Sequence, residues 1–122
     1  MLISDDKSLK QLKEEFQGKF PHLSINFYQK AHKTSEGNTN EQMLDENLTI
    51  ATVRTIHNEG DMSIDGHLKT STFEQQFRDK FGVNVQVFRK AKDIWLQTTV
   101  TDHWTLAEQE RAALEYEQRV EG

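Results

Sequence analysis

The side chains in this sequence that could do metal or acid–base chemistry include five histidines dispersed along the chain: His22, His32, His57, His67 and His103. No two of them form an H-x-x-x-H pair, and none has the paired carboxylate spacing of a zinc site. His57, Glu59, Asp61 and His67 cluster in sequence and would offer nitrogen and oxygen ligands to a metal ion. Such residues more often line a solvated turn. The sequence therefore predicts no metal site.

Nucleophiles and phosphate-binding loops are also missing from the sequence. The chain has no cysteine, and no serine lies in a G-x-S-x-G turn. Asp102 and His103 are neighbours, but a His–Asp pair without a nucleophile is not a catalytic triad. No G-x-G-x-x-G or G-x-x-x-x-G-K string is present to hold a nucleotide phosphate. We therefore predict a protein that is not an enzyme and uses no cofactor.

Composition limits the classes of partner. The 122 residues carry a formal net charge of −5, with 29% charged and 34% hydrophobic residues. A negative net charge argues against nonspecific attraction to nucleic acid or anionic lipid, because both depend on summed positive charge. No apolar run approaches the length of a membrane span or a signal peptide. We expect a single domain, 1–122, that is cytoplasmic and not bound to a membrane.

The clearest structural unit lies at 70–92, where a predicted helix is followed by a turn and a strand. Three aromatic side chains share one helix face at i, i+4 and i+8: Phe73, Phe77 and Phe81. Ser71 and Glu74 have the spacing of a capping box at the helix start, and Gly82 suits a left-handed residue at its end. Three valines then alternate with polar residues, as in a half-buried strand: Val83, Val85 and Val87.

A similar unit opens the chain. Asp5 and Asp6 are the expected caps of a helix that Pro21 ends. Its apolar face carries Leu9, Leu12, Phe16 and Phe20. A strand with alternating apolar residues follows, at Leu23, Ile25 and Phe27. The sequence thus predicts a second strand–helix–strand unit, with a short first strand at the N-terminus.

The two units align with each other. At an offset of 61 positions the chain repeats the residue types of Met1, Ile3, Phe16, Lys19 and Phe20. After one inserted residue, Lys30-Ala31 falls on Lys90-Ala91. These positions lie off the hydrophobic face, so their identity favours a duplication over a shared pattern. We predict two copies at about 1–32 and 62–92, separated by a polar loop at 33–43.

Two such units interleave into a ferredoxin-like plait, which is an α+β fold of four antiparallel strands with both helices on one face. The alternating run Ile94–Val100 would add a C-terminal hairpin strand to this sheet. Thr49 would cap a short helix, and Thr105 with Glu108 would cap a terminal helix that reaches about Val120. The alternative is a plain α+β sandwich in which the short strands at 1–4 and 62–65 do not pair centrally.

Strand alternation gives the functional prediction. If the valine face is inward, the outward face displays amides, aromatics and lysines, which we take as candidate partner-binding residues: Tyr28, Lys30, Asn84, Gln86, Phe88, Lys90, Trp95 and Gln97. Such a face suits a small interaction or regulatory module that docks a protein partner or self-associates. Alternatively, a helix covers this face and the aromatics belong to a second core.

A third possibility is that this face binds single-stranded nucleic acid by stacking bases on the aromatics. Nucleic acid is nevertheless an unlikely partner, because the chain is acidic and lacks a glycine-aromatic string typical of RNA-recognition sheets. The basic turns of the two copies should also lie at opposite ends of the plait.

The segment from Phe73 to Glu108 contains two motifs, FGVNVQVFRK at 81–90 and DHWTLAE at 102–108. It resembles a family of small uncharacterised bacterial proteins that share an F-G-h-x-V-Q-V-F/Y-R-K strand and a D-x-W-T-L-A-E helix start. The resemblance covers about the C-terminal half of the chain. It implies a natural folded unit and no particular activity.

Overall fold

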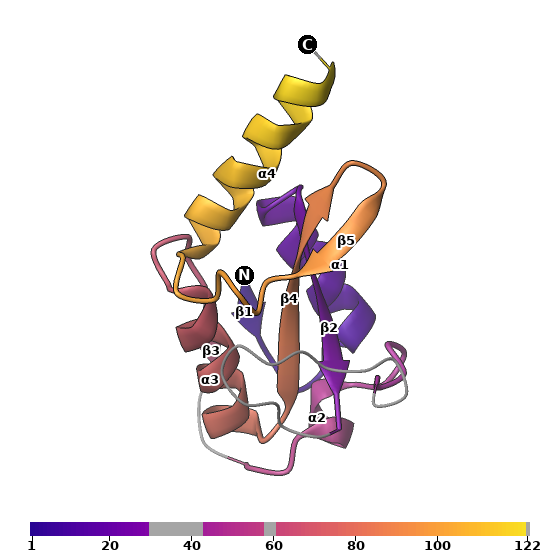
Figure 1. Ribbon diagram of the computed structural model, residues 1–122. Coiled ribbons are helices and arrows are strands. Elements are labelled where there is room, and N and C mark those ends of the chain that lie inside the picture. The colour runs from indigo at the N-terminus through magenta and orange to yellow at the C-terminus, as the bar shows by residue number, and fades with distance from the viewer. Residues whose placement is uncertain (30–42, 58–60, 122) are drawn as a thin grey trace.

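The computed structural model describes residues 1–29, 43–57 and 61–121, without the side chains of 120 and 121 (Figure 1). In chain order its elements are β1 (Leu2–Ile3), α1 (Leu9–Lys19), β2 (Leu23–Tyr28), α2 (Ile50–Val53), β3 (Met62–Ser63), α3 (Thr70–Phe81), β4 (Asn84–Ala91), β5 (Ile94–Gln97) and α4 (Leu106–Glu121). This mixture confirms the predicted α+β class. Within the described parts of the chain, no helix is both long and apolar enough to cross a membrane.

The described strands form two antiparallel sheets. β1 pairs with β3, and the second sheet has the order β2-β4-β5. β2 and β4 pair directly from Leu23↔Arg89 to Tyr28↔Asn84, whereas a ferredoxin-like plait would hold β1, β2, β3 and β4 in one sheet. The plait is therefore not confirmed. The predicted hairpin strand is present, because β5 pairs with β4 from Ala91↔Ile94 to Phe88↔Gln97.

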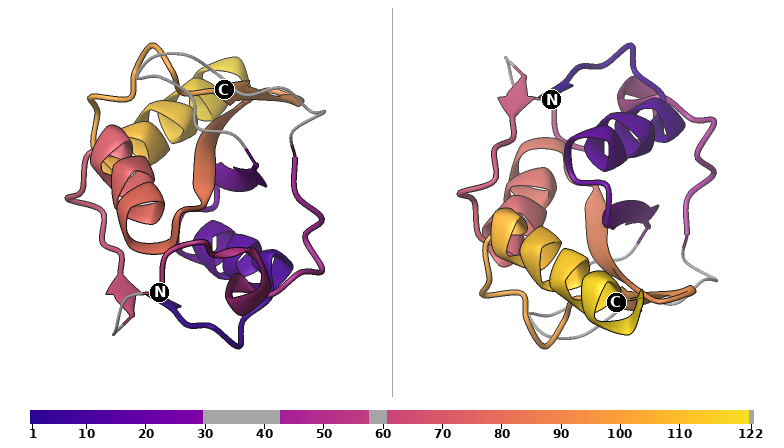
Figure 2. Two further views of the ribbon diagram at one scale, coloured as in Figure 1. Left: turned by 90° about the horizontal axis from the view of Figure 1, so that it is seen from below. Right: turned by 90° about the horizontal axis from the view of Figure 1, so that it is seen from above.

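The hydrophobic core lies between helices α1 and α3 and one face of the β2-β4-β5 sheet. The apolar faces of α1 and α3 are buried as the sequence predicts, and they meet where the rings of Phe16 and Phe73 stack at 5.4 Å between centroids. Phe27 of β2 contacts the Phe77 ring edge-on at 5.7 Å. Figure 2 shows α1 and α3 beside each other along the sheet. Burying these aromatic side chains is the main driving force for the fold.

Helix ends follow the predicted chemistry in some places and not in others. Gly82 ends α3 with a left-handed φ of 66°. Thr105 and Glu108 form the predicted capping box, in which each side chain accepts from the other residue's backbone N–H at 3.1 Å. Asp5 and Asp6, however, do not cap α1, because the helix begins later and Ser8 accepts from the Gln11 N–H. The helix starts where its apolar face starts.

The predicted Ser71–Glu74 capping box is wrong. α3 begins at Thr70, and its N-cap residue Lys69 makes no side-chain cap hydrogen bond. Glu74 is buried and accepts from the Val87 backbone N–H at 2.9 Å. The pairing of β5 with β4 stops at Phe88, so the Glu74 carboxylate from α3 accepts the hydrogen bond of the next strand N–H, that of Val87.

The loops that precede the helices join the two halves of the chain in matching ways. Ser8 before α1 bridges to Thr49 before α2, and Lys69 before α3 bridges to Thr105 before α4. α2 stops at Val53, whereas α4 continues to Glu121. α4 is thus a long helix at the position where the first half has the single helical turn α2.

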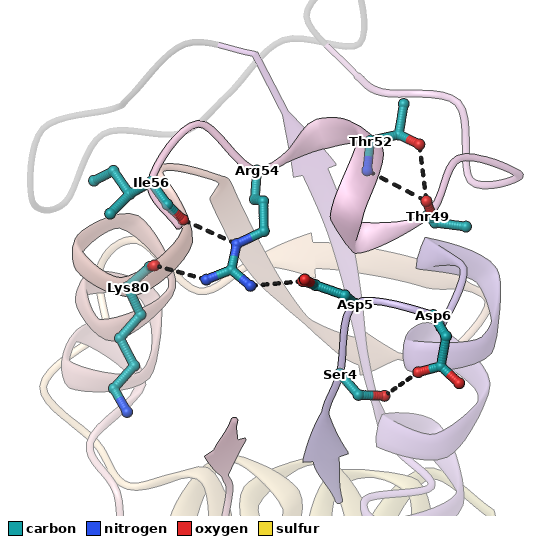
Figure 3. A network of polar contacts seen from close by, with 8 residues as sticks. All are labelled: Ser4, Asp5, Asp6, Thr49, Thr52, Arg54, Ile56 and Lys80. Atoms are coloured by element: carbon teal, nitrogen blue, oxygen red, sulfur yellow. Dashed lines mark hydrogen bonds and ion pairs between the residues drawn. The ribbon is translucent and has the colours of Figure 1, made fainter. Parts of the chain in front are cut away.

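Arg54 joins three segments just after α2 (Figure 3). Its Nη1 donates to Asp5 Oδ1 at 2.6 Å, and its Nε donates to the Ile56 carbonyl at 2.9 Å. The third guanidinium nitrogen, Nη2, donates to the Lys80 carbonyl at the end of α3. The guanidinium also lies 4.5 Å from the centre of the Phe81 ring. Arg54 is buried, so these contacts replace the water that the cation loses.

Candidate functional site: a groove between the β4–β5 hairpin and α4

Strand register places the predicted site residues of the sheet on one face. Tyr28 lies opposite Asn84, Phe88 opposite Gln97, and Lys90 opposite Trp95. Directly opposed residues of antiparallel strands point to the same side of a sheet, and alternate residues along a strand do so too. Gln86 therefore shares this face with Asn84 and Phe88, whereas Lys30 lies outside the described residues.

Three of these side chains are buried and not displayed, contrary to the expectation of an open face. Tyr28 and Gln86 are 1% exposed and Asn84 is 6% exposed. Among the described residues, no hydrogen-bond partner faces Tyr28 Oη, Asn84 Oδ1 or Gln86 Oε1. Burial raises the pKa of Tyr28, and the nearby Asn26 side chain opposes the shift. Alternation predicts the side to which a residue points but not what covers that side.

The rest of this face forms a small pocket of about 250 Å³. Phe88 and Trp95 supply its aromatic walls, and its polar groups come from Lys13, Gln17, Ser24 and Asn26. Lys13 Nζ donates to Asn26 Oδ1 at 3.0 Å and lies 3.7 Å from Glu46 Oε2. The lysine of this pocket is thus already paired with groups of the protein.

A larger concavity lies on the opposite face of the hairpin. It has a volume of about 620 Å³ and lies between the β4–β5 hairpin and α4. We call it the hairpin groove and define it by its apolar lining residues: Ile94, Leu96, Trp104, Ala112, Ala113 and Tyr116. In Figure 1 the hairpin and the last turns of α4 both project at the same end of the molecule.

The hairpin positions the first wall of the groove. Lys92 and Asp93 make a two-residue loop, in which Lys92 has a φ of 58°. A positive φ at the first loop residue matches the twist of tight antiparallel hairpins. Ile94 and Leu96 point toward the groove, since they oppose Ala91 and Arg89 in the register. Ile94 is 59% exposed and Leu96 is 41% exposed, so this wall is apolar and open to solvent.

Trp104 and Arg89 form the base of the groove. The Arg89 guanidinium lies 5.2 Å from the centre of the Trp104 ring, and its Nη1 donates to Gln109 Oε1 at 2.9 Å. Gln109 is fully buried and also donates to the Thr101 carbonyl. Burial lowers the pKa of Arg89, but an arginine remains a cation at neutral pH. The base of the groove is therefore held by contacts within the protein.

His22 fixes α4, the second wall, to the start of β2. Its Nδ1 lies 2.6 Å from Glu110 Oε2, its Nε2 lies 2.5 Å from Glu117 Oε2, and its backbone N–H donates to Glu110 at 2.7 Å. Partial burial alone would lower the pKa of His22. The hydrogen bonds and Coulombic attraction of the two carboxylates outweigh it and raise the pKa above 6.5. Protonated His22 thus links two turns of α4 to the body.

The chemistry that this arrangement supports is binding. Within the described residues no group of three His, Cys, Asp or Glu side chains is placed to hold a metal ion. Glu59 of the sequence cluster around His57 lies outside those residues. The groove combines an apolar surface with Lys92 and Asp93 at the tip of the hairpin, whereas Lys90 lies opposite Trp95 in the register and points to the other face. An apolar concavity of this kind can accept an apolar stripe of another protein.

Sequence reasoning predicted both elements of the groove but not the groove itself. Ile94 and Leu96 were predicted on a strand and Tyr116 on the terminal helix, but the hairpin residues taken as site residues were those of the other face: Asn84, Gln86, Phe88, Lys90, Trp95 and Gln97. The available signal was that Ile94, Trp95 and Leu96 are apolar in succession, so the strand presents apolar side chains on both faces. The face with Ile94 and Leu96 was expected in the core, but these two side chains are largely exposed to solvent.

Comparisons of the chain with protein-family models, with curated proteins and with solved structures found no match.

Proposed function

We propose that this protein is a small interaction module that binds a protein partner in the hairpin groove. The exposed apolar lining carries the proposal. Nine large hydrophobic side chains are exposed among the described residues, and three of them line the groove: Ile94, Leu96 and Tyr116. Apolar exposure that gathers around a concavity is typical of a protein-binding surface.

The predicted duplication supports the same site. We infer that the two halves are copies, because strands that correspond in the repeat pair with each other. The β1–β3 partners Leu2 and Ser63 are 61 positions apart, which is the offset of the repeat. The β2–β4 partners Asn26 and Gln86 are 60 positions apart, which is the offset after the inserted residue. The second half has a hairpin strand, β5, and a long terminal helix, α4. These two elements form the groove. The plait is not part of this proposal, because the strands pair in two sheets.

Nucleic-acid binding on the sheet face is less well supported. Tyr28 is buried, so Phe88 and Trp95 are the aromatics of that face left for base stacking. Lys13 in the same pocket is paired with Glu46. A protein partner therefore remains the proposal.

Photo-cross-linking tests this function. A photoreactive amino acid is placed at Leu96 in the groove or, as a control, at Val100, which is 82% exposed but does not line the groove. We expect defined cross-linked species from position 96 in cells that produce the protein and only background from position 100. Equal patterns from both positions would overturn the proposal.

A further inference from the structure

We propose that the occupant of the hairpin groove is a second copy of this chain, whose α4 lies antiparallel along α4 of the first copy. This inference rests on the proposed function and names its partner.

The exposed side of α4 continues the groove. A smaller concavity of about 200 Å³ shares Trp104 and Ala112 with the hairpin groove and is otherwise lined by Glu108, Arg111 and Glu115. The spacing of these α4 residues is three or four, so they form one stripe along the helix. Figure 2 shows α4 on the outside of the molecule along its whole length. The stripe thus forms a continuous surface on which a second helix can pack.

The charges on this stripe are complementary to themselves. If α4 packs antiparallel on α4 of a second copy, with the two-fold axis midway between Arg111 and Glu115, Arg111 faces Glu115 of the partner subunit. The symmetry repeats this contact, and Arg119 of the partner subunit comes within one residue of the position opposite Glu108. All four side chains are exposed. A parallel pairing would instead oppose each charge to its own copy, which is repulsive.

The apolar part of the stripe suits close packing. Ala112 leaves room for two helix axes to approach, and Tyr116 extends beyond it toward the hairpin. Lys92 at the tip of the hairpin supplies positive charge, whereas α4 has five glutamates and two arginines between Leu106 and Glu121. A second α4 would therefore bring both apolar surface and acidic side chains to the groove.

Charge reversal tests the pairing in the full-length chain. Sedimentation equilibrium measures self-association of the wild type, Arg111→Glu, Glu115→Arg and the double variant, with Glu14→Arg on α1 as an exposed control. Each single reversal creates two like-charge contacts by symmetry, and we expect it to weaken dimerisation at least about tenfold. The double variant and the control should dimerise like the wild type.

Mixing the two single variants makes the test specific. In the mixed pair, the carboxylate introduced by Arg111→Glu faces the guanidinium introduced by Glu115→Arg, and the two unchanged side chains at these positions face each other. An equimolar mixture should therefore form dimers that neither variant forms alone. The proposal would be overturned by a monomeric wild type at about 100 μM, or by single and double variants that behave alike. In that case cross-links from position 96 to other proteins would leave the proposed function standing.

Discussion

At the scale of single residues, two glycines have opposite requirements. Gly82 has a left-handed φ, and a Cβ placed there would lie 1.8 Å from Thr55 Oγ1. Gly18 is exposed inside α1, and a Cβ there would meet nothing within 4 Å. We predict that Gly82→Ala lowers the free energy of unfolding by about 2 to 4 kcal/mol.

Gly18→Ala should instead raise that free energy by about 0.5 to 1 kcal/mol, because alanine loses less backbone entropy in a helix. Urea unfolding monitored by circular dichroism measures both. Equal effects of the two replacements would show that Gly82 is not constrained as described.

Asp5 and Asp6 are neighbours with different partners (Figure 3). Asp5 accepts from the buried Arg54, whereas exposed Asp6 accepts from the Ser4 hydroxyl at 2.7 Å. Asp5→Ala should lower the free energy of unfolding by about 1 to 2 kcal/mol, since solvent screens the half-exposed carboxylate of this pair. Asp6→Ala should leave it unchanged, and a similar loss in both variants would disprove the role of Arg54.

Tyr28 has a buried hydroxyl for which the described residues offer no hydrogen-bond partner. Removing that oxygen while keeping the ring should relieve a desolvation cost. We predict that Tyr28→Phe raises the free energy of unfolding by about 1 kcal/mol and leaves self-association unchanged. A loss of stability would mean that the hydroxyl has a favourable contact.

At the scale of elements, the attachment of α4 depends on the protonation of His22. The folded state raises the pKa of His22 above the unfolded value of 6.5. Its stabilising contribution is therefore complete below pH 6.5 and is lost as the pH rises through the raised folded-state pKa.

We expect amide protons in the second half of α4 to exchange faster, relative to intrinsic rates, as the pH rises through this window. The dependence should disappear in His22→Gln and persist in His67→Gln, whose histidine lies in an exposed loop before α3. Hydrogen–deuterium exchange followed by mass spectrometry measures it. A dependence that persists in His22→Gln would assign the effect to another group.

Element boundaries followed from periodicity where an apolar face had to be buried. The phenylalanine face of α3 and the alternation in β2 and β4 predicted these elements, because both patterns reflect one buried side. Glu74 shows where local patterns fail, since its carboxylate binds a strand N–H that is distant in sequence. A local spacing rule contains no information about such a tertiary contact.

At the scale of the whole molecule, strand pairing was the part of the fold that the sequence did not determine. The short strands β1 and β3 pair with each other, and β2 pairs with β4, so two sheets form. The alternation of apolar and polar residues is equally compatible with the plait. Alternation determines the face of the sheet to which each side chain points, but not which strands are neighbours. The residues predicted to bind a partner lie on one face of the hairpin, and the hairpin groove lies on the other.

The central claim is that the hairpin groove serves binding and not folding. Leu96→Ser is the direct test, measured as the cross-linking yield from a photoreactive group at Tyr116, with Val100→Ser as the matched control. We predict that the yield falls severalfold in Leu96→Ser and is unchanged in Val100→Ser, while both variants unfold at the wild-type urea concentration. An unchanged yield in Leu96→Ser, with the chain folded, would contradict the claim.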